Sequence, residues 1–116
     1  MTTATLPAIA AAYVRTINAH DRAGFIALFA DGAIVDDAGR EFRGLAAIKD
    51  WAESDIFAVN VTLDVLGVGQ RDGAVVLTTK VEGNFDRTGL PDPVVIEQHI
   101  VGEQKIQRLT CRLAGA

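Results

Sequence analysis

The sequence predicts a single α+β domain, in which three N-terminal helices wrap around an antiparallel sheet formed mainly by the second half of the chain. Up to about residue 54 the apolar residues recur at spacings of three and four, which is typical of amphipathic helices. From residue 59 onward apolar and polar residues alternate, which is typical of strands with one buried face. Nearly half of the 116 residues are hydrophobic, so we expect one core over residues 1–116.

Three helices are expected in the first half of the chain. The first runs from Pro7 to about residue 19, because its apolar residues form one stripe and proline suits a first helical turn. Asp21 is a favourable N-cap for a second, shorter helix with apolar residues up to position 29. The Asp31-Gly32 pair is expected to end this helix and turn the chain. A third helix is predicted over residues 45–54.

The expected strands are short in the first half and long in the second. The pattern predicts them at residues 33–37, 41–43, 59–65, 74–81, 94–101 and 105–113. The tripeptide Arg71-Asp72-Gly73 is a hairpin signal, and a tight turn is expected around Gly102. Consecutive strands joined by hairpins favour antiparallel pairing.

Composition excludes several classes of function. Cys111 is the single cysteine, so no internal disulfide and no cysteine-based metal framework is expected, and the two histidines lack paired-ligand spacing. Lysines and arginines do not cluster, so nucleic acid is not an expected partner. No apolar run reaches the roughly 18 residues of a membrane span, and no signal peptide is visible, so we expect a cytoplasmic protein. The glycines form no nucleotide-binding loop, and no cofactor is expected.

A family resemblance is found between residues 13 and 51. The segments that show it are Tyr13-Val-Arg-Thr-Ile-Asn-Ala-His-Asp21, Phe25-Ile-Ala-Leu-Phe-Ala-Asp31, Ala33-Ile-Val-Asp-Asp37, Phe42-Arg-Gly44 and Ala47-Ile-Lys-Asp-Trp51. Together they resemble the nuclear transport factor 2-like superfamily, and within it the SnoaL-like proteins and ketosteroid isomerases. The resemblance implies a cone-shaped, strongly curved sheet around a pocket for a small hydrophobic molecule. It also implies a homodimer packed through the outer sheet face.

Asp37 is the first candidate catalytic residue. In a strand, Val35 and Asp37 share one face while Ile34 and Asp36 share the other, so the two aspartates cannot hold one metal ion together. The resemblance assigns the Val35 face to the pocket and matches Asp37 to the general base of the isomerases. A carboxylate at an apolar cavity is poorly hydrated and can accept a proton from carbon. The alternative is that Asp37 only caps the turn at Gly39.

Tyr13 is the second candidate, because the resemblance matches it to the tyrosine that stabilises a developing oxyanion. A phenol can donate a hydrogen bond to an enolate oxygen, which is most effective in a dry pocket. The alternative is an ordinary core tyrosine on the buried stripe of a helix. It is the only tyrosine of the chain.

The late strand departs from the isomerase pattern, which has an aspartate as a second oxyanion donor where this chain has Ile96. Glu97 and His99 share one face of this strand, and Ile96 and Gln98 share the other. If Glu97 and His99 face the pocket, they form a second acid–base pair opposite Asp37. If they face outward, they are solvent-exposed or dimer-face groups. The alternation alone leaves both possibilities open.

Apolar and aromatic residues complete the expected pocket. Trp51 is expected to form one wall, and the further candidate lining residues are Phe25, Phe29, Val35, Phe57, Leu109, Cys111 and Leu113. Core packing is the alternative for all of them. Cys111 has no activating base nearby in sequence, so we expect a buried, unreactive thiol.

Two functional hypotheses follow from these residues. The first is a cofactor-independent, isomerase- or cyclase-like enzyme that transfers a proton on a small apolar carbonyl compound, with Asp37 as base and Tyr13 as donor. Glu97 or His99 would be the auxiliary acid. The second is a non-catalytic domain for binding a small hydrophobic ligand or for dimerisation.

Overall fold

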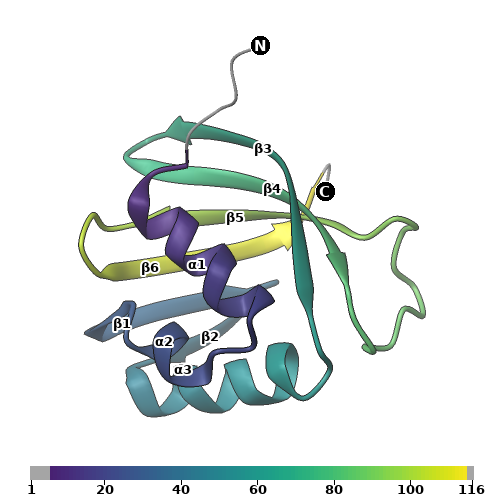
Figure 1. The fold of residues 1–116 in the computed structure, drawn as a ribbon, viewed down its shortest axis with the longest axis horizontal. Coiled ribbons are helices and arrows are strands. Elements are labelled where there is room, and N and C mark those ends of the chain that lie inside the picture. The colour runs from purple at the N-terminus through teal and green to yellow at the C-terminus, as the bar shows by residue number, and fades with distance from the viewer. Residues whose placement is uncertain (1–5, 115–116) are drawn as a thin grey trace.

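The computed structural model describes residues 6–114, which form helices and one six-stranded sheet (Figure 1). The helices are α1 (Ala8–Asn18), α2 (Arg22–Ile26) and α3 (Leu45–Ala52), and α3 continues into a π-helical turn, Glu53–Phe57. The strands are β1 (Phe29–Asp37), β2 (Arg40–Arg43), β3 (Thr62–Arg71), β4 (Ala74–Glu82), β5 (Val95–Val101) and β6 (Ile106–Leu113). None of the helices among these residues is long and apolar enough to span a membrane.

The sheet has the strand order β2-β1-β6-β5-β4-β3. It curves, and α1 lies across its inner side while α2 and α3 cover the β1–β2 end (Figure 1). The predicted α+β fold with a curved sheet wrapped by three helices is therefore confirmed. All neighbouring strands are antiparallel except β1 and β6, which are parallel and pair Val35 with Leu109. The parallel pair brings an early and a late segment of the chain together.

The prediction for residues 27–32 was wrong. The second helix ends at Ile26, and Phe29 begins β1, so Asp31 and Gly32 lie inside a strand. Pairing with β6 overrides the local turn signal: Phe29 pairs with Ile106, and Leu28 O accepts a hydrogen bond from Ile106 N at 2.7 Å. The ladder shifts register between Phe29 and Ile34, which accommodates the extra residues as an irregularity.

The start of β3 was predicted too early, at residue 59 instead of Thr62. The helical segment extends through the π-helical turn to Phe57, and Asn60 has a φ of 54°, so the strand begins only at Thr62. The β3–β4 hairpin was predicted correctly: Asp72 and Gly73 have φ values of 53° and 80°, as a two-residue turn of this type requires.

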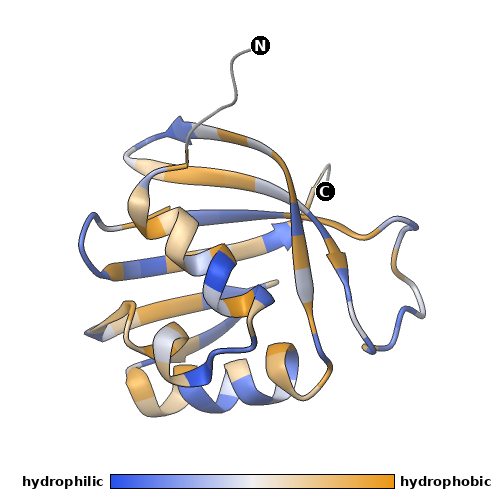
Figure 2. Cartoon of the chain, in the orientation of Figure 1, coloured by the Kyte–Doolittle hydropathy of each residue, from blue (hydrophilic) through white to orange (hydrophobic). Residues whose placement is uncertain are grey.

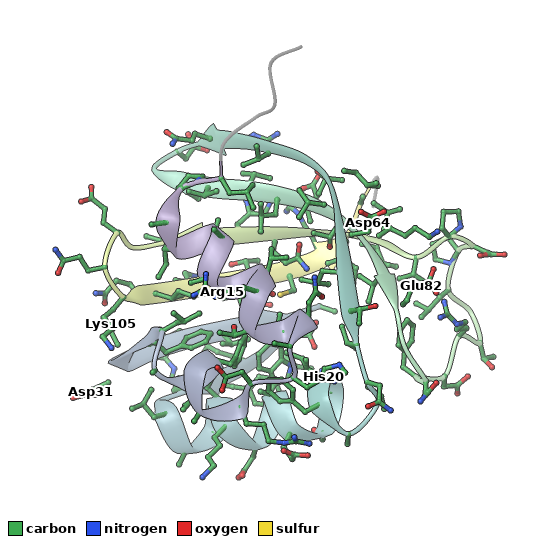
Figure 3. All side chains as sticks on the ribbon, in the orientation of Figure 1. Arg15, His20, Asp31, Asp64, Glu82 and Lys105 are labelled. Carbon is green, nitrogen blue, oxygen red and sulfur yellow. The ribbon has the colours of Figure 1, made fainter. Side chains whose placement is uncertain are left out.

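Helix α1 is fastened to β3 by one side chain. Asn18 Nδ2 donates to Leu63 O at 3.0 Å, and Asn18 Oδ1 accepts from Leu63 N at 2.7 Å. The apolar stripe of α1, with Ile9, Tyr13 and Ile17 buried, packs onto the inner face of the sheet. Figure 3 draws the side chains on the ribbon, and hydrophilic residues gather in the β5–β6 hairpin (Figure 2).

Candidate functional site

A cavity opens on the inner side of the sheet and narrows toward α1. Its mouth has a volume of about 560 Å³, and a deeper chamber of about 90 Å³ continues from it. The two share the lining residues Asp37, Asp55, Val61, Val81 and Ile96. The mouth is within the range of roughly 300–1,000 Å³ that is usual for small-molecule pockets.

The strand register places three chamber residues in one row across the sheet. Asp37 of β1 pairs with Cys111 of β6, and Cys111 pairs with Gln98 of β5. Tyr13 of α1, Trp51 of α3 and Asp55 of the π-helical turn complete the polar part of the lining. The other chamber residues are mainly apolar: Ile17, Ile56, Val61, Leu63, Val81 and Ile96. The sequence therefore folds two of the predicted site residues, Asp37 and Tyr13, onto one chamber.

Asp37 is oriented by two donors. Trp51 Nε1 donates to Asp37 Oδ2 at 3.0 Å, and an Arg40 guanidinium nitrogen donates to the same oxygen at 2.6 Å. Within residues 6–114 no hydrogen bond reaches Oδ1, which is therefore the oxygen available to take a proton. The neighbouring Asp36, not Asp37, caps the turn, because its Oδ1 accepts from Gly39 N at 3.0 Å. The turn-capping alternative thus applies to the other aspartate.

Arg40 lies at the mouth and bridges two carboxylates. The guanidinium nitrogen that contacts Asp37 also lies 2.5 Å from Asp55 Oδ2. These contacts raise the pKa of Arg40, with the hydrogen bond that Arg40 donates to Asp55 as the largest cause. The side chain is 56% exposed, so solvent screens both ion pairs. Sequence analysis had not singled out Arg40 or Asp55; the position of Arg40 directly after the Asp37 turn was the available signal.

Tyr13 is buried, with only 2% of its surface exposed. Burial, with smaller contributions from the adjacent Cys111 thiol and the Asp37 charge, raises its pKa well above the ordinary value. The phenol therefore keeps its proton and acts as a hydrogen-bond donor. Burial likewise raises the pKa of the Cys111 thiol, as does the Asp37 charge, which agrees with the expected unreactive cysteine.

Gln98 is a further site residue that sequence analysis missed. It is 3% exposed on the inner face of β5 and lines the chamber. Its Oε1 accepts a hydrogen bond from Thr79 Oγ1 of β4 at 3.1 Å, and Thr79 is fully buried. The available signal was a polar residue at an alternating position between Ile96 and Ile100, both on the inner face.

Glu97 and His99 lie on the outer face of the sheet, so they do not form an acid–base pair opposite Asp37. The side chains of Ile96 and Gln98 occupy the inner face instead. Glu97 Oε1 lies 3.2 Å from His99 Nε2 and 3.7 Å from Arg112 Nε. The hydrogen bond from His99, with the Arg112 charge, lowers the pKa of Glu97. The pairing register of β5 decides between the two possible orientations of Glu97 and His99, since a shift by one residue would exchange the inner and outer faces of the strand.

The predicted lining residues lie at three depths. Trp51 and Cys111 line the chamber, and Leu113 lines the mouth. The remaining predicted residues are buried in the core and do not belong to the lining of this cavity: Phe25, Phe29, Val35, Phe57 and Leu109. Phe25 sits at the centre of an aromatic cluster, with ring centroids 5.9 Å from Tyr13 and 6.5 Å from Trp51. These core residues support the wall rather than forming it.

The arrangement combines an acceptor and donors in a narrow apolar space. A carboxylate with one free oxygen can remove a proton, and a protonated phenol can stabilise the negative charge that this creates. Among residues 6–114 no three side chains of His, Cys, Asp or Glu are grouped so as to hold a metal ion.

Known families and structures resemble this chain along most of its length. The family model described as the SnoaL-like domain matches residues 10–104. A Sinorhizobium meliloti protein that has been proposed to be a polyketide cyclase is 24% identical, with a TM-score of 0.80 over 92% of this chain and 95% of that chain. A Catenulispora acidiphila protein with a ketosteroid isomerase-like fold, in complex with trimethylamine, is 21% identical, with a TM-score of 0.74 over 93% and 86%.

A third structure contains a steroid derivative. It is RV0760c from Mycobacterium tuberculosis in complex with estradiol-17beta-hemisuccinate, which is 18% identical, with a TM-score of 0.69 over 89% of this chain and 88% of that chain. No curated protein matches the sequence significantly. At these identities the solved structures establish a shared fold.

Proposed function

Because the chain belongs to the SnoaL-like domain family, we propose that its cavity binds a small, mostly apolar carbonyl compound and transfers a proton on it without a cofactor. The reaction would be of the isomerase or cyclase type. Asp37 is the base, and Tyr13 is the hydrogen-bond donor. The observation that supports this most is the meeting of Asp37 and Tyr13 in one narrow chamber.

The proposed step begins with the ligand's carbonyl oxygen at Tyr13. Asp37 Oδ1 removes a proton from the carbon next to the carbonyl group. The electron pair of that C–H bond moves toward the carbonyl oxygen, which becomes an enolate, and the Tyr13 hydroxyl stabilises it by donating a hydrogen bond. The carboxylic acid then returns the proton to another carbon, or the enolate attacks a second carbonyl carbon of the ligand to close a ring. In the second case the C=O electron pair of that carbonyl group moves onto its oxygen, which takes the proton back from Asp37.

The lining of the cavity mouth and one solved structure with this fold support a ligand of this kind. The apolar lining of the mouth comes from the segment before β3, from β4 and β5, and from the loop that joins them, and includes Val59, Val81, Phe85, Leu90 and Val94. The estradiol-17beta-hemisuccinate complex of RV0760c is an example of a largely apolar ligand on this fold. The narrow chamber would hold the reacting carbonyl end, and the mouth would hold the rest of the molecule.

A specific contact favours the second hypothesis, a non-catalytic binding domain. Asp37 Oδ2 already accepts hydrogen bonds from Trp51 and Arg40, so the carboxylate has structural partners within the protein itself. In that case Asp37 would be a structural group at the pocket wall, and the cavity would bind its ligand unchanged.

Exchange of the α-protons of a ketone with deuterium separates the two hypotheses. Wild type and Asp37→Asn would be incubated with cyclohexenone in deuterium oxide and followed by NMR. Asparagine keeps the shape and can still accept the Trp51 hydrogen bond, but it cannot take a proton. We expect exchange with wild type and background exchange with the variant, while both bind the enone. Equal exchange would remove Asp37 from the mechanism and favour the binding domain.

We also propose a homodimer that packs through the outer sheet face, and a cytoplasmic location. The outer face of β4–β6 is mixed in character, with Thr78, Glu97, His99, Val101 and Arg112 along it. Val101 is an exposed large hydrophobic residue there. Sedimentation at micromolar concentration should show a dimer, and Val101→Glu should shift it toward the monomer. A wild-type monomer would contradict the proposed dimer, and cell fractionation would test the location.

A further inference from the structure

Thr79 and Gln98 form a buried polar pair on the inner face of the sheet, behind the deepest part of the cavity. Gln98 lines the chamber with Tyr13, whereas Thr79 lies behind it on β4 and is fully buried. Thr79 Oγ1 lies 3.1 Å from Gln98 Oε1 and 3.4 Å from the backbone oxygen of Ile96. Burying an amide in an apolar wall costs free energy unless the amide is hydrogen-bonded, and Thr79 supplies one of its hydrogen bonds.

The Thr79 hydroxyl fixes the orientation of the amide. An amide presents an acceptor at one end and two donor hydrogens at the other. Because Oε1 accepts the hydrogen bond from Thr79, the NH₂ group points away from Thr79, and Gln98 and Tyr13 line the same chamber. Donation from Gln98 to the phenol oxygen agrees with its effect on Tyr13, whose pKa it lowers against the larger opposing effect of burial.

The single proton of the Tyr13 hydroxyl has two possible acceptors. One is the Cys111 thiol, which lines the same chamber, and sulfur is a weak acceptor. A carbonyl oxygen in the chamber is a stronger acceptor, so the proton can turn to it at little cost. The second amide hydrogen of Gln98 is available to the same oxygen.

We infer that Thr79 and Gln98 are positioning residues for Tyr13, and that together they make the Tyr13 end of the chamber favour a ligand group that accepts hydrogen bonds, such as a ketone or enone oxygen. Thr79 holds the amide, the amide donates to the phenol oxygen, and both groups present hydrogens to the chamber. An ammonium group, which only donates, would meet donors at this end instead of acceptors. This preference of the chamber rests on the proposed function, whereas the orientation of Tyr13 does not.

The orientation can be tested without any ligand, because the chain has one tyrosine and therefore one side-chain ¹³Cζ resonance. Thr79→Val keeps the shape and removes the hydroxyl, so the amide can reverse and the Tyr13 resonance should move. Thr79→Ser restores the hydroxyl and should restore the resonance. Thr78→Val, the neighbouring residue on the outer face, is the matched control and should change nothing. Gln98→Leu should move the Tyr13 resonance as Thr79→Val does. If Thr79→Val fails to fold, Gln98→Leu takes its place in the test.

The ligand arm uses cyclohexenone and the infrared stretch of its carbonyl group. Two hydrogen-bond donors should lower the stretching frequency of the bound carbonyl group in wild type. The loss of one donor in Thr79→Val or Gln98→Leu should raise this frequency again. It should also weaken enone binding about three- to tenfold, which is the usual range for one hydrogen bond. An unchanged Tyr13 resonance in folded Thr79→Val and Gln98→Leu overturns the positioning role. If the resonance moves but wild type binds no enone, the proposed function fails and the preference for an accepting group fails with it.

Discussion

Trp51 Nε1 donates a hydrogen bond to Asp37 Oδ2 at 3.0 Å, which joins the single tryptophan of the chain to the proposed base. Trp51 is buried, and its ring also packs against Phe25 and Phe42, with centroids 6.5 Å and 6.1 Å apart. The orientation of the carboxylate is therefore set by a residue that the core holds in place. A change at Asp37 should also be visible in the tryptophan fluorescence.

Asp37→Leu should destabilise the protein more than Asp37→Asn. Leucine leaves the buried indole N–H without an acceptor, which costs about 1–3 kcal/mol, whereas asparagine can still accept. Urea unfolding followed by Trp51 fluorescence gives both free energies of unfolding. The native emission of Asp37→Leu should also shift to shorter wavelength, because a hydrogen-bonded indole has a lower-energy excited state. Equal stability of the two variants would show that this hydrogen bond contributes little.

The Arg40–Asp55 ion pair at the mouth should contribute little to stability. Its side chains are 56% and 32% exposed, and exposed pairs contribute about 0.2–1 kcal/mol. A double-mutant cycle of Arg40→Gln and Asp55→Asn, measured by urea unfolding at low and high salt, should give a coupling in this range that shrinks with salt. A coupling above about 2 kcal/mol that salt does not change would instead indicate a pair shielded from solvent.

Glu97→Gln and His99→Gln should leave the exchange of enone α-protons within about twofold of wild type. Both residues lie on the outer face, away from Asp37 and Tyr13. Because the pKa of Glu97 is lowered in the folded protein, its charged form stabilises the fold above the ordinary pKa of 4.5, and this contribution is lost as the pH falls through the lowered value. Both variants should therefore be slightly less stable than wild type above pH 4.5 and should approach its stability as the pH falls, and a large loss of exchange would return the two residues to the mechanism.

Tyr13 should ionise only when the protein unfolds. Its pKa is 10.0 in an unfolded chain and raised in the fold, so the folded protein binds this proton more tightly. Stability should be unaffected by Tyr13 below pH 10 and should fall as the pH rises above it. Tyrosinate absorbance and circular dichroism should change together in an alkaline titration, and Tyr13→Phe removes the absorbance change. Ionisation with native circular dichroism would show that water reaches the phenol.

Cys111 should react with thiol reagents only after unfolding. The thiol is buried and its raised pKa leaves almost no thiolate, which is the reactive form. The labelling rate with a water-soluble disulfide reagent should therefore follow the unfolded fraction in urea. Fast labelling of the native protein, compared with an unlabelled Cys111→Ser control, would indicate that the chamber opens widely.

The pattern of residues predicted the fold well, because helical spacing and strand alternation record which faces are buried. The family resemblance assigned Asp37 and Tyr13 to the pocket, and both line the chamber. Strand alternation correctly put Asp37 on the face opposite Asp36. Alternation did not predict which face of β5 turns inward, since it defines two faces without identifying the buried one. Gln98 was missed for that reason. Phe29 was assigned to a helix because its strand exists only through pairing with β6, which lies far away in sequence.

The central position of β6 has a consequence for how the protein is made. β6 fills the gap between β1 and β5, and it is synthesised after both of them. Until it leaves the ribosome, the facing edges of β1 and β5 have no neighbour, and such edges invite pairing with other chains. The row of Asp37, Cys111 and Gln98 also does not exist before then. The insertion of β6 thus closes the sheet and assembles the chamber in the same step, so an incomplete chain has neither.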